Sequence, residues 1–305
     1  MKRTREQRTF IIAFLAPAFL LFTIFVAYPG LRALAYSLQR WDGLRKPEWI
    51  GLENFQALLT AESLFFRALQ HNLILLFGGG SIVLALALFF AAALHRGVRG
   101  AQVFRIAFFF PNVIASVAVA LLWVLLYSTT DFGLINALLG QIQQALSAIG
   151  ISWLDDRLPI AFTDSRTLIY ALIPVMVWTG TGFFMVLFLA AMQTIPESYY
   201  DAAKLDGASP VAQFRHITLP LMREVLIVAA VFLIISSMKF FDSVWVIENQ
   251  YPTTESHVLA TVLYQKVFSE YNIGYGAAVA VLLFIIVFAA TLITLRMKQK
   301  EALEY

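Results

Sequence analysis

The chain has 305 residues, of which 60% are hydrophobic and 13% are charged. A soluble protein could not cover so apolar a core with so few charges, so the composition excludes an ordinary globular domain and indicates several membrane spans. The formal charge of +3 comes without any basic stretch interleaved with aromatics, which gives no reason to expect nucleic acid as a partner. The absence of cysteine excludes disulfides and thiolate metal sites in this chain.

Six apolar runs are long enough to cross a membrane, because about 20 residues at 1.5 Å each span about 30 Å of hydrocarbon. Each is expected to be a helix, since lipid cannot satisfy the backbone groups of an open strand. The prediction is an all-α polytopic membrane protein with a single transmembrane domain over residues 1–305. The first run is too long for the apolar region of a signal peptide and has no small-residue cleavage site, so we expect it to be retained. The predicted helices cover residues 10–35, 72–94, 104–127, 168–192, 221–246 and 274–295.

Basic residues in the flanks indicate the orientation, because cytoplasmic flanks carry an excess of Lys and Arg. With the N-terminus inside, the cytoplasmic set is Lys2, Arg3, Arg5, Arg8, Arg96, Arg99, Arg105, Lys204, Arg215, Arg223, Arg296, Lys298 and Lys300. The smaller opposite set is Arg40, Arg45, Lys46, Arg67, Arg157, Arg166 and Lys266. Both termini are therefore predicted to be cytoplasmic.

Residues 128–167 form a long outer segment that carries one apolar helical stripe. Its members recur at steps of three and four residues, as on one face of a helix. They are Ile135, Leu138, Leu139, Ile142, Leu146 and Ile149. Such a helix either lies on the bilayer or the helix bundle, or offers a docking surface to a partner.

The segment "ESYYDAAKLDGASPVAQFRHITLP", residues 197–220, is a polar island between two apolar runs, and the predicted orientation places it in the cytoplasm. Pro196 suits the first turn of a helix, and Gly207 suits the left-handed residue that ends it. Ser209 and Pro210 suit the cap and the first residue of a second short helix. We therefore predict a helix, a sharp turn and a second helix.

The surface of this helical pair would suit a lever that projects from the membrane. Ala202 and Ala203 make one side thin enough to enter a groove, while Tyr199, Leu205 and Phe214 offer apolar anchors. A plain connector between two spans would carry the same turn signals, so that interpretation stays open.

The run 168–192 is one candidate for a transport path, because it carries Pro174 and the cluster "WTGTG". A break there would free backbone groups to line a polar cavity, and a Trp face suits stacking on a sugar ring. The candidate residues are Trp178, Thr179 and Thr181. The alternative is a kinked helix whose small residues only pack.

Lys239 and Asp242 in the run 221–246 are predicted to pair on one helix face. A charge at mid-bilayer costs roughly 3 kcal/mol or more and would indicate function. Lys239, however, lies about 27 Å along the helix from Leu221, near the outer boundary, where a long side chain reaches water at little cost. We treat the pair as candidates for a cavity mouth, whereas Asn112 is interpreted as a helix-start residue.

The glycine cluster "FGGGS", residues 77–81, lacks the lysine of the phosphate-binding pattern G-x-x-x-x-G-K-[ST]. It lies in a predicted span, where small residues serve helix packing. His71, His95, His216 and His257 offer no pair at helical spacing for a zinc site. We therefore expect no cofactor in this chain and no enzymatic activity of its own.

Several motifs together resemble one family. "DAAKLDGA", Phe214 and "ITLP" resemble the cytoplasmic EAA loop of the permease subunits of ABC importers, with its consensus Glu-Ala-Ala, a following Gly and a distal Ile-x-Leu-Pro. "LAAMQTIPESYYDAA" resembles the carbohydrate and glycerol-phosphate branch, which includes the maltose permeases. "WIGLENF", "FFFPNVIASVAVALLW", "GLINALL", "FFDSVWVI" and "YNIGYGAAVAVLLFII" resemble that branch in order, over nearly the whole chain. Two departures are Asp201 in place of the family's Glu and "IENQYP" in place of a glycine-rich turn.

This resemblance implies a type I ABC importer permease fold and a coupling mechanism. The loop would insert as a coupling helix into a cleft of a cytoplasmic ATPase, so that ATP-driven closure of the ATPase dimer rocks the membrane helices. The implied assembly adds a second permease, two ATPase subunits holding ATP and Mg²⁺, and an extracytoplasmic solute-binding protein, and it imports a sugar through a bacterial or archaeal inner membrane. The coupling residues carried over are Asp201, Ala202, Ala203, Asp206, Gly207, Ile217, Leu219 and Pro220.

Other functions stay open at this point. The same machinery would serve glycerol phosphate or another small polar solute. A self-sufficient secondary transporter is a different class, although the inverted repeats and multiple intramembrane charges typical of such proteins are not evident. An intramembrane enzyme would need a nucleophile and base that the sequence does not offer.

Overall fold

The computed structural model of the protein describes residues 5–61, 63–95, 97, 99–130, 132–150 and 158–296. The described chain is almost entirely helical, as predicted, and it divides into two compact units. One unit holds residues 1–62 and 262–285, and the other holds residues 63–261 and 286–305. Of the basic residues that orient the chain, Lys2, Arg3, Arg96, Arg157, Lys298 and Lys300 lie outside the described residues.

The first unit begins with a long apolar helix and continues into a short antiparallel strand pair. The apolar helix extends over Phe10–Ser37 and contains the predicted run 10–35. The strands pair Gln39 with Trp49 and Arg40 with Glu48. In order, the elements are α1 (Arg5–Phe22), a π-helical turn (Thr23–Ala27), α2 (Tyr28–Ser37), β1 (Gln39–Arg40), β2 (Glu48–Trp49), α3 (Glu53–Gln56) and a second π-helical turn (Ala57–Ala61).

Two polar contacts hold the strand pair in the first unit. The side-chain amide of Asn54, which is buried, donates to the carbonyl oxygens of Ser37 and Gln39, both at 2.9 Å. Gly274, near the start of α16 (Ile273–Arg296), donates its backbone N–H to the carbonyl of Trp41. A Cβ at Gly274 would lie 1.9 Å from the carbonyl oxygen of Gln39, so only glycine fits this approach.

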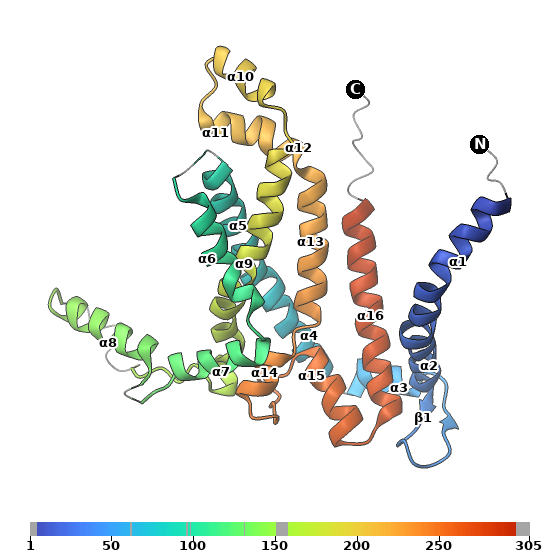
Figure 1. The fold of residues 1–305 in the computed structure, drawn as a ribbon. Coiled ribbons are helices and arrows are strands. Elements are labelled where there is room, and N and C mark those ends of the chain that lie inside the picture. The colour runs from blue at the N-terminus through green and yellow to red at the C-terminus, as the bar shows by residue number, and fades with distance from the viewer. Residues whose placement is uncertain are drawn as a thin grey trace. The chain divides into compact units, whose positions relative to one another are not determined.

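The second unit is a helical bundle centred on α9 (Ser165–Gln193), which packs against α5 (Gly80–His95) and α6 (Ala101–Val113) (Figure 1). Ahead of α5 lie α4 (Ser63–Ile74) and a π-helical turn (Leu75–Gly79). The remaining elements are α7 (Ser116–Leu126), α8 (Leu134–Ser147), α10 (Glu197–Leu205), α11 (Pro210–Gln213), a π-helical turn (Phe214–Thr218), α12 (Leu219–Leu221), α13 (Arg223–Met238), α14 (Asp242–Ile247) and α15 (Leu259–Tyr264), which is followed by a π-helical turn (Gln265–Ser269) in the first unit.

Glycines set the closest approaches within this bundle. A Cβ at Gly182 of α9 would lie 1.9 Å from the backbone oxygen of Phe108 in α6, so these two helices touch through their backbones. A Cβ at Gly80 would lie 2.5 Å from a methyl carbon of Leu233 in α13. The prediction that the glycines of residues 77–81 serve helix packing is therefore confirmed.

Five helices in the described residues are long and apolar enough to cross a membrane. The spans Ser63–His95, Ser165–Gln193, Arg223–Ile247 and Ile273–Arg296 contain or closely match the predicted runs 72–94, 168–192, 221–246 and 274–295, and the first of them begins earlier than predicted. Many of their side chains are apolar and exposed, such as Phe89 and Phe288. This is the arrangement expected where lipid replaces water.

The predicted single helix over residues 104–127 is wrong. α6 and α7 are bent by 98° at a break between Val113 and Ser116. Ile114 and Ala115 take extended backbone angles, with ψ of 137° and 132°, which interrupts the helical hydrogen bonds. Asn112 consequently lies in the last turn of α6 rather than at a helix start.

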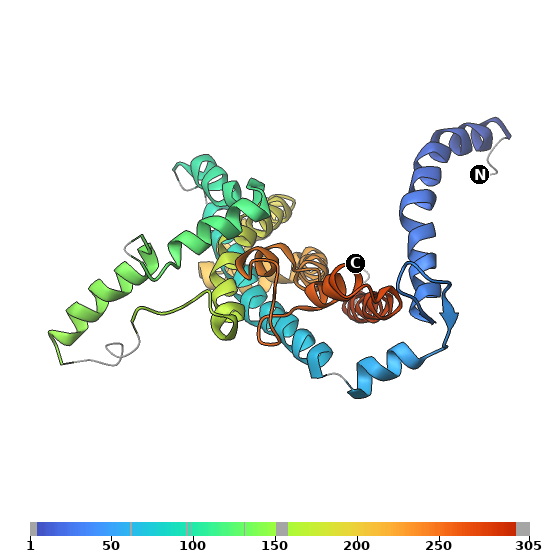
Figure 2. The same ribbon diagram turned by 90° about the horizontal axis from the view of Figure 1, so that it is seen from below.

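The predicted amphipathic helix in the outer segment is present as α8, which extends away from α9 in both views (Figures 1 and 2). Its buried residues are polar: Asn136 donates to the carbonyl of Ile160 and accepts from its backbone N–H. The apolar stripe is only partly covered: Leu138, Ile142 and Ile149 are exposed, while Ile135, Leu139 and Leu146 are half-buried. Two alternatives therefore stay open for the exposed part of the stripe: a membrane surface covers it, or a partner protein does.

Candidate functional site

The polar island of residues 197–220, here called the lever, projects beyond one end of the second unit (Figure 1). α9 ends at Gln193, and the chain turns through Thr194–Pro196 into α10. Pro196 has the extended ψ of 135° and occupies the position just before the helix, one residue earlier than predicted. Glu197 follows in the first turn, where its carboxylate lies at the positive end of the helix dipole.

Gly207 ends α10 in the way that the sequence predicts. Its φ is +76°, in the left-handed region, and the N–H of Ala208 donates to the carbonyl of Ala203 at 2.9 Å. The N–H of Gly207 donates to the carbonyl of Lys204 at 3.0 Å, with Asp206 as the helix cap. These two bonds form a Schellman motif, which satisfies carbonyls that the helix end would leave unpaired.

Ser209 starts the second helix. Its Oγ accepts the backbone N–H of Ala212 at 3.2 Å, and Pro210 takes the first helical position, as predicted. From Pro210 the chain remains helical through the π-helical turn to Leu221, and α13 begins at Arg223. The second arm of the lever is thus nearly continuous with a membrane span, which would transmit a force on the lever to that span.

The tip of the lever is apolar and uncovered. Leu205 is 91% exposed and Val211 is 74% exposed, and Tyr199 of the same helix pair is also exposed. Sequence reasoning missed Val211 and took Phe214 as an outward anchor, but Phe214 turns inward to line a cavity. Of the predicted coupling residues, Asp201, Ala202, Asp206, Gly207 and Pro220 are exposed, while Ala203, Ile217 and Leu219 are half-buried.

Asp201 already has a partner within the lever. Its Oδ1 lies 2.9 Å from Nζ of Lys204, one helical turn later. The hydrogen bond and the charge of Asp201 raise the pKa of Lys204. Both side chains are more than half exposed, so this pair is weak and open to exchange with a partner's charge.

A hydroxyl pair closes the two arms of the lever on each other. The Tyr200 hydroxyl of α10 lies 3.0 Å from Oγ1 of Thr218, in the turn that leads to α13. Thr218 is 4% exposed, so this contact is shielded from water. It fixes the angle between the first helix and the arm that enters the span.

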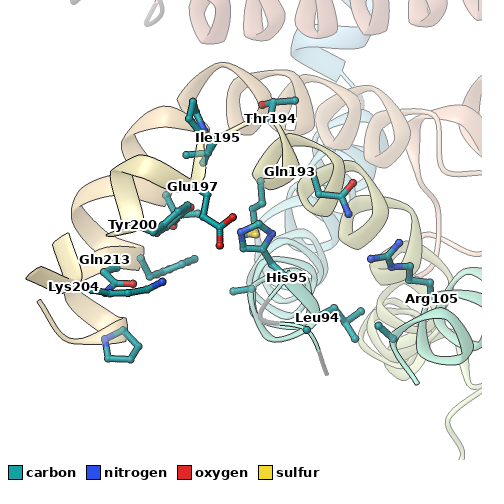
Figure 3. Close-up of a pocket in the computed structure, with 18 residues that line it drawn as sticks. Leu94, His95, Arg105, Gln193, Thr194, Ile195, Glu197, Tyr200, Lys204 and Gln213 are labelled. Carbon is teal, nitrogen blue, oxygen red and sulfur yellow. Dashed lines mark hydrogen bonds between the residues drawn. The ribbon is translucent and has the colours of Figure 1, made fainter. Parts of the chain in front are cut away.

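Beneath the lever lies a cavity of about 1000 Å³, bounded by α10 and the turn after α11 on one side and the ends of α5, α6 and α9 on the other. In Figure 3, Glu197 and Lys204 come from the lever, while His95 and Arg105 come from α5 and α6. The rings of His95 and Tyr200 lie 6.0 Å apart between their centroids. The lever therefore rests over a polar space rather than on a packed floor.

A second candidate site forms where two interrupted helices meet. Ser116 is the first residue of α7, after the bend, and Asp242 is the first residue of α14. Ser116 Oγ donates to Asp242 Oδ2 at 2.5 Å, and α7 packs against α14. We call this contact the break junction.

The predicted pairing of Lys239 and Asp242 on one helix face is wrong. α13 ends at Met238, so the two residues lie on either side of a break, and Asp242 is bonded to Ser116. Lys239 is exposed and makes no hydrogen bond or ion pair with another described residue.

Asn72 of α4 forms hydrogen bonds with two backbone groups, one of them beside the break that follows α13. Its side-chain amide donates to the carbonyl of Ser237 at 2.7 Å, and its oxygen accepts the N–H of Leu259 at 2.9 Å. Ser237 lies in the last turn of α13, and among the described residues its carbonyl otherwise accepts only the long bond of 3.4 Å from the N–H of Phe240 and the N–H of the helix cap, Lys239. Asn72 is fully buried, so it gives this carbonyl a short hydrogen bond without water.

The candidates on α9 lie in an unbroken helix, so the break that Pro174 suggested is absent. The hydroxyls of Thr179 and Thr181 donate to carbonyls of their own helix, those of Val175 and Val177. Trp178 packs edge-on against Trp123 of α7, with ring centroids 6.1 Å apart. Thr181 is buried and Trp178 is about one-third exposed, and their role in a transport path stays a prediction.

Comparison with known families decides the class of the protein. The family of binding-protein-dependent transport system inner membrane components matches residues 83–300, which include the lever and the break junction. The chain belongs to this family. It is a membrane-spanning permease component of an ABC transport system.

Relatives extend the match over the whole permease. It is 32% identical over 293 residues to a probable ABC transporter permease protein of Pyrococcus horikoshii, covering 95% of this chain and 96% of that protein. It is 30% identical over 303 residues to the diacetylchitobiose uptake system permease protein of Streptomyces coelicolor, covering 95% and 82%. The xylose/arabinose import permease protein of Haloferax volcanii is 29% identical over 254 residues, covering 82% and 76%.

A solved structure supports the fold. A chain of a bacterial ABC transporter involved in the import of the acidic polysaccharide alginate superposes with a TM-score of 0.76, covering 97% of both chains at 21% identity. The permease therefore has the fold expected for an ABC importer subunit.

Proposed function

We propose that this permease carries a sugar or oligosaccharide into the cytoplasm and is driven by ATPase subunits that dock on the lever. In this proposal ATP and Mg²⁺ bind to the ATPase partners, a second related permease completes the pore, and a solute-binding protein delivers the sugar from outside. Both termini and the lever lie in the cytoplasm, in keeping with the basic flanks. The relatives named for diacetylchitobiose uptake and for xylose and arabinose import support a sugar as the solute.

The exposed tip of the lever carries this proposal. Leu205 and Val211 stand almost fully exposed on a rigid, doubly capped helix pair that leads directly into a span. Burying both side chains in a partner's cleft would contribute on the order of 3–6 kcal/mol. A plain connector has no need of such a surface, whereas a docking helix does.

The break junction supports a route for a polar solute. Transport proteins commonly build their solute sites where membrane helices are interrupted, because the freed backbone groups and helix ends can bind polar atoms. Here two interruptions meet at Ser116 and Asp242, and Lys239 lies three residues before Asp242 in the chain. We assign the solute path to this junction rather than to the threonines of α9, whose hydroxyls are occupied within their own helix.

Docking is tested by co-purification of the permease with each candidate ABC ATPase subunit. We expect Leu205→Asp and Ala203→Trp to abolish the complex, the first by placing a charge at the tip and the second by thickening the inserted side. The matched control is Leu44→Asp, because Leu44 is 90% exposed but lies in the first unit, far along the chain from the lever. If Leu44→Asp abolished the complex equally, the proposal that the ATPase docks on the lever would be contradicted.

Transport is tested in proteoliposomes that hold the assembled importer with its binding protein and a radiolabelled sugar. Uptake should require ATP and the ATPase subunits. Uptake by the permease alone would instead establish a secondary transporter. The sugar itself is found from the solute that raises the melting temperature of the binding protein, and a response only to glycerol phosphate would assign the permease to that solute.

A further inference from the structure

The cavity beneath the lever contains a cation, Arg105, that has no partner among the described residues. Arg105 of α6 lines the cavity, and its Nε atom is buried without a hydrogen-bond partner. Its guanidinium makes no hydrogen bond or ion pair with any described residue. Arg105 is half-buried, and a charged donor such as its Nε that is shielded from water without an acceptor is costly, so this group favours an anionic partner in the cavity.

Two other charged side chains, Lys204 and Glu197, also line the cavity. Lys204 is already bonded to Asp201, at 2.9 Å. Glu197 at the start of α10 has no hydrogen bond or ion pair with a described residue, and its carboxylate points into the space in Figure 3. Among the described residues the cavity thus presents the guanidinium of Arg105 on one wall and, on the other, the Glu197 carboxylate, whose charge acts on Lys204 without a hydrogen bond or ion pair to it.

The remaining lining is suited to the border between a membrane and water. His95, Gln193 and Gln213 supply neutral hydrogen-bonding groups, while Leu94 and Phe214 supply apolar surface. The space of about 1000 Å³ is bounded by the ends of membrane helices. A ligand with a polar, doubly charged head and an apolar body fits this combination.

The geometry points to a binding site for a phospholipid headgroup that carries a phosphate and a primary ammonium, as in phosphatidylethanolamine. The phosphate pairs with the guanidinium of Arg105, for which planar, two-pronged hydrogen bonding is favourable. The ammonium donates to the carboxylate of Glu197. A soluble phosphoethanolamine ester shares this chemistry, but the apolar lining and the position at the helix ends favour the lipid.

A headgroup bound in this way would bridge α6 and α10, the fixed bundle and the lever. The lipid would therefore hold the lever at one angle and make its motion dependent on membrane composition. Only this consequence rests on the proposed coupling function. The binding itself is a separate property of the chain.

Binding is measured by native mass spectrometry of the full-length permease released from nanodiscs, made with phosphatidylethanolamine, phosphatidylglycerol or phosphatidylcholine. The first lipid should be retained preferentially, because phosphatidylglycerol lacks the ammonium and phosphatidylcholine lacks its N–H donors. Arg105→Gln should reduce retention by at least about tenfold, the effect of losing a charged hydrogen bond. Arg105→Lys should retain an intermediate amount, and Glu197→Gln should abolish the preference over phosphatidylglycerol.

The matched control is Arg99→Gln, which removes an exposed arginine outside the cavity lining. It should retain the lipid like the wild type, and melting temperatures should show that the variants remain folded. Retention by Arg105→Gln equal to that of Arg99→Gln would overturn the proposal. Displacement of the lipid by glycerophosphoethanolamine at equal concentration would also overturn it, in favour of a soluble ligand. Neither result depends on whether an ATPase docks on the lever.

Discussion

The hydroxyl groups of Tyr200 and Thr218 lie 3.0 Å apart and join the first helix of the lever to the arm that enters a membrane span. Because Thr218 is buried, water competes little for this bond. The hydroxyl pair therefore fixes the angle between the two arms of the lever. A force on α10 is then passed to α13 instead of being lost in bending.

Tyr200→Phe should therefore uncouple the importer without preventing assembly. The lost bond is worth about 1 kcal/mol net, enough to populate a loosened lever several-fold more often. We expect normal co-purification with the ATPase but fewer solute molecules imported per ATP hydrolysed. Tyr199→Phe is the control, since Tyr199 is exposed and its hydroxyl has no bond to a described residue. Identical coupling ratios in the two variants would contradict the prediction.

Gly207→Ala should weaken the lever through backbone strain alone. No atom lies within 4 Å of the position that a Cβ would take, but the φ of +76° costs a residue with a side chain about 1 kcal/mol or more. The variant should bind the ATPase more weakly, whereas Gly207→Asn should bind better than Gly207→Ala because asparagine tolerates this region. Gly140→Ala, in open space within α8, should be neutral or slightly stabilising. Affinities by surface plasmon resonance and melting temperatures check this series.

The lever was predictable from the sequence because its signals are local. Ser209 and Pro210 cap a helix through their own neighbouring backbone, and Gly207 supplies a conformation that other residues resist. The inward turn of Phe214 was not predictable, since it depends on a cavity formed by distant segments. Sequence periodicity identifies an apolar residue, but it does not say which side of a short helix finds a partner.

Gly182→Ala should disrupt the packing of α9 on α6. The added carbon would lie 1.9 Å from the backbone oxygen of Phe108, and a backbone atom cannot move aside by rotating a side chain. Overpacking of this kind costs about 1–3 kcal/mol, so we expect a lowered melting temperature and reduced yield. Gly180→Ala is the matched control on the same helix, because its nearest neighbour is a methyl of Val83 at 3.4 Å, an ordinary contact. If Gly180→Ala lowered the melting temperature as much as Gly182→Ala, the close approach to Phe108 would not be the cause.

The two helix breaks show where sequence reasoning stops. The run 221–246 is apolar enough for a continuous span, and nothing local marks its interruption at Lys239. The break is supported by Asn72, far away in the sequence, which donates a short hydrogen bond to the carbonyl of Ser237. The bend after Pro111 is similar: a proline within a helix weakens it, but the tertiary contact at Ser116 decides where the chain turns.

The break junction offers a test of the transport path, because Ser116 in the junction can be compared with Ser236, a serine inside α13. Ser116 donates to the carboxylate of Asp242 across two helices, whereas Ser236 donates to the carbonyl of Leu233 within its own helix. If the junction lines the path, Ser116→Ala leaves the carboxylate without its donor and should reduce the transport rate by about tenfold, the effect of losing a bond to a charged group. Asp242→Asn should reduce it at least as much, and Ser236→Ala should leave it unchanged. The readout is uptake in proteoliposomes together with the ATPase rate, since a damaged path lowers uptake while ATP hydrolysis continues. If uptake fell equally for Ser236→Ala, or survived in Asp242→Asn, the break junction would not line the transport path. Trp178 on α9 would then be the next candidate.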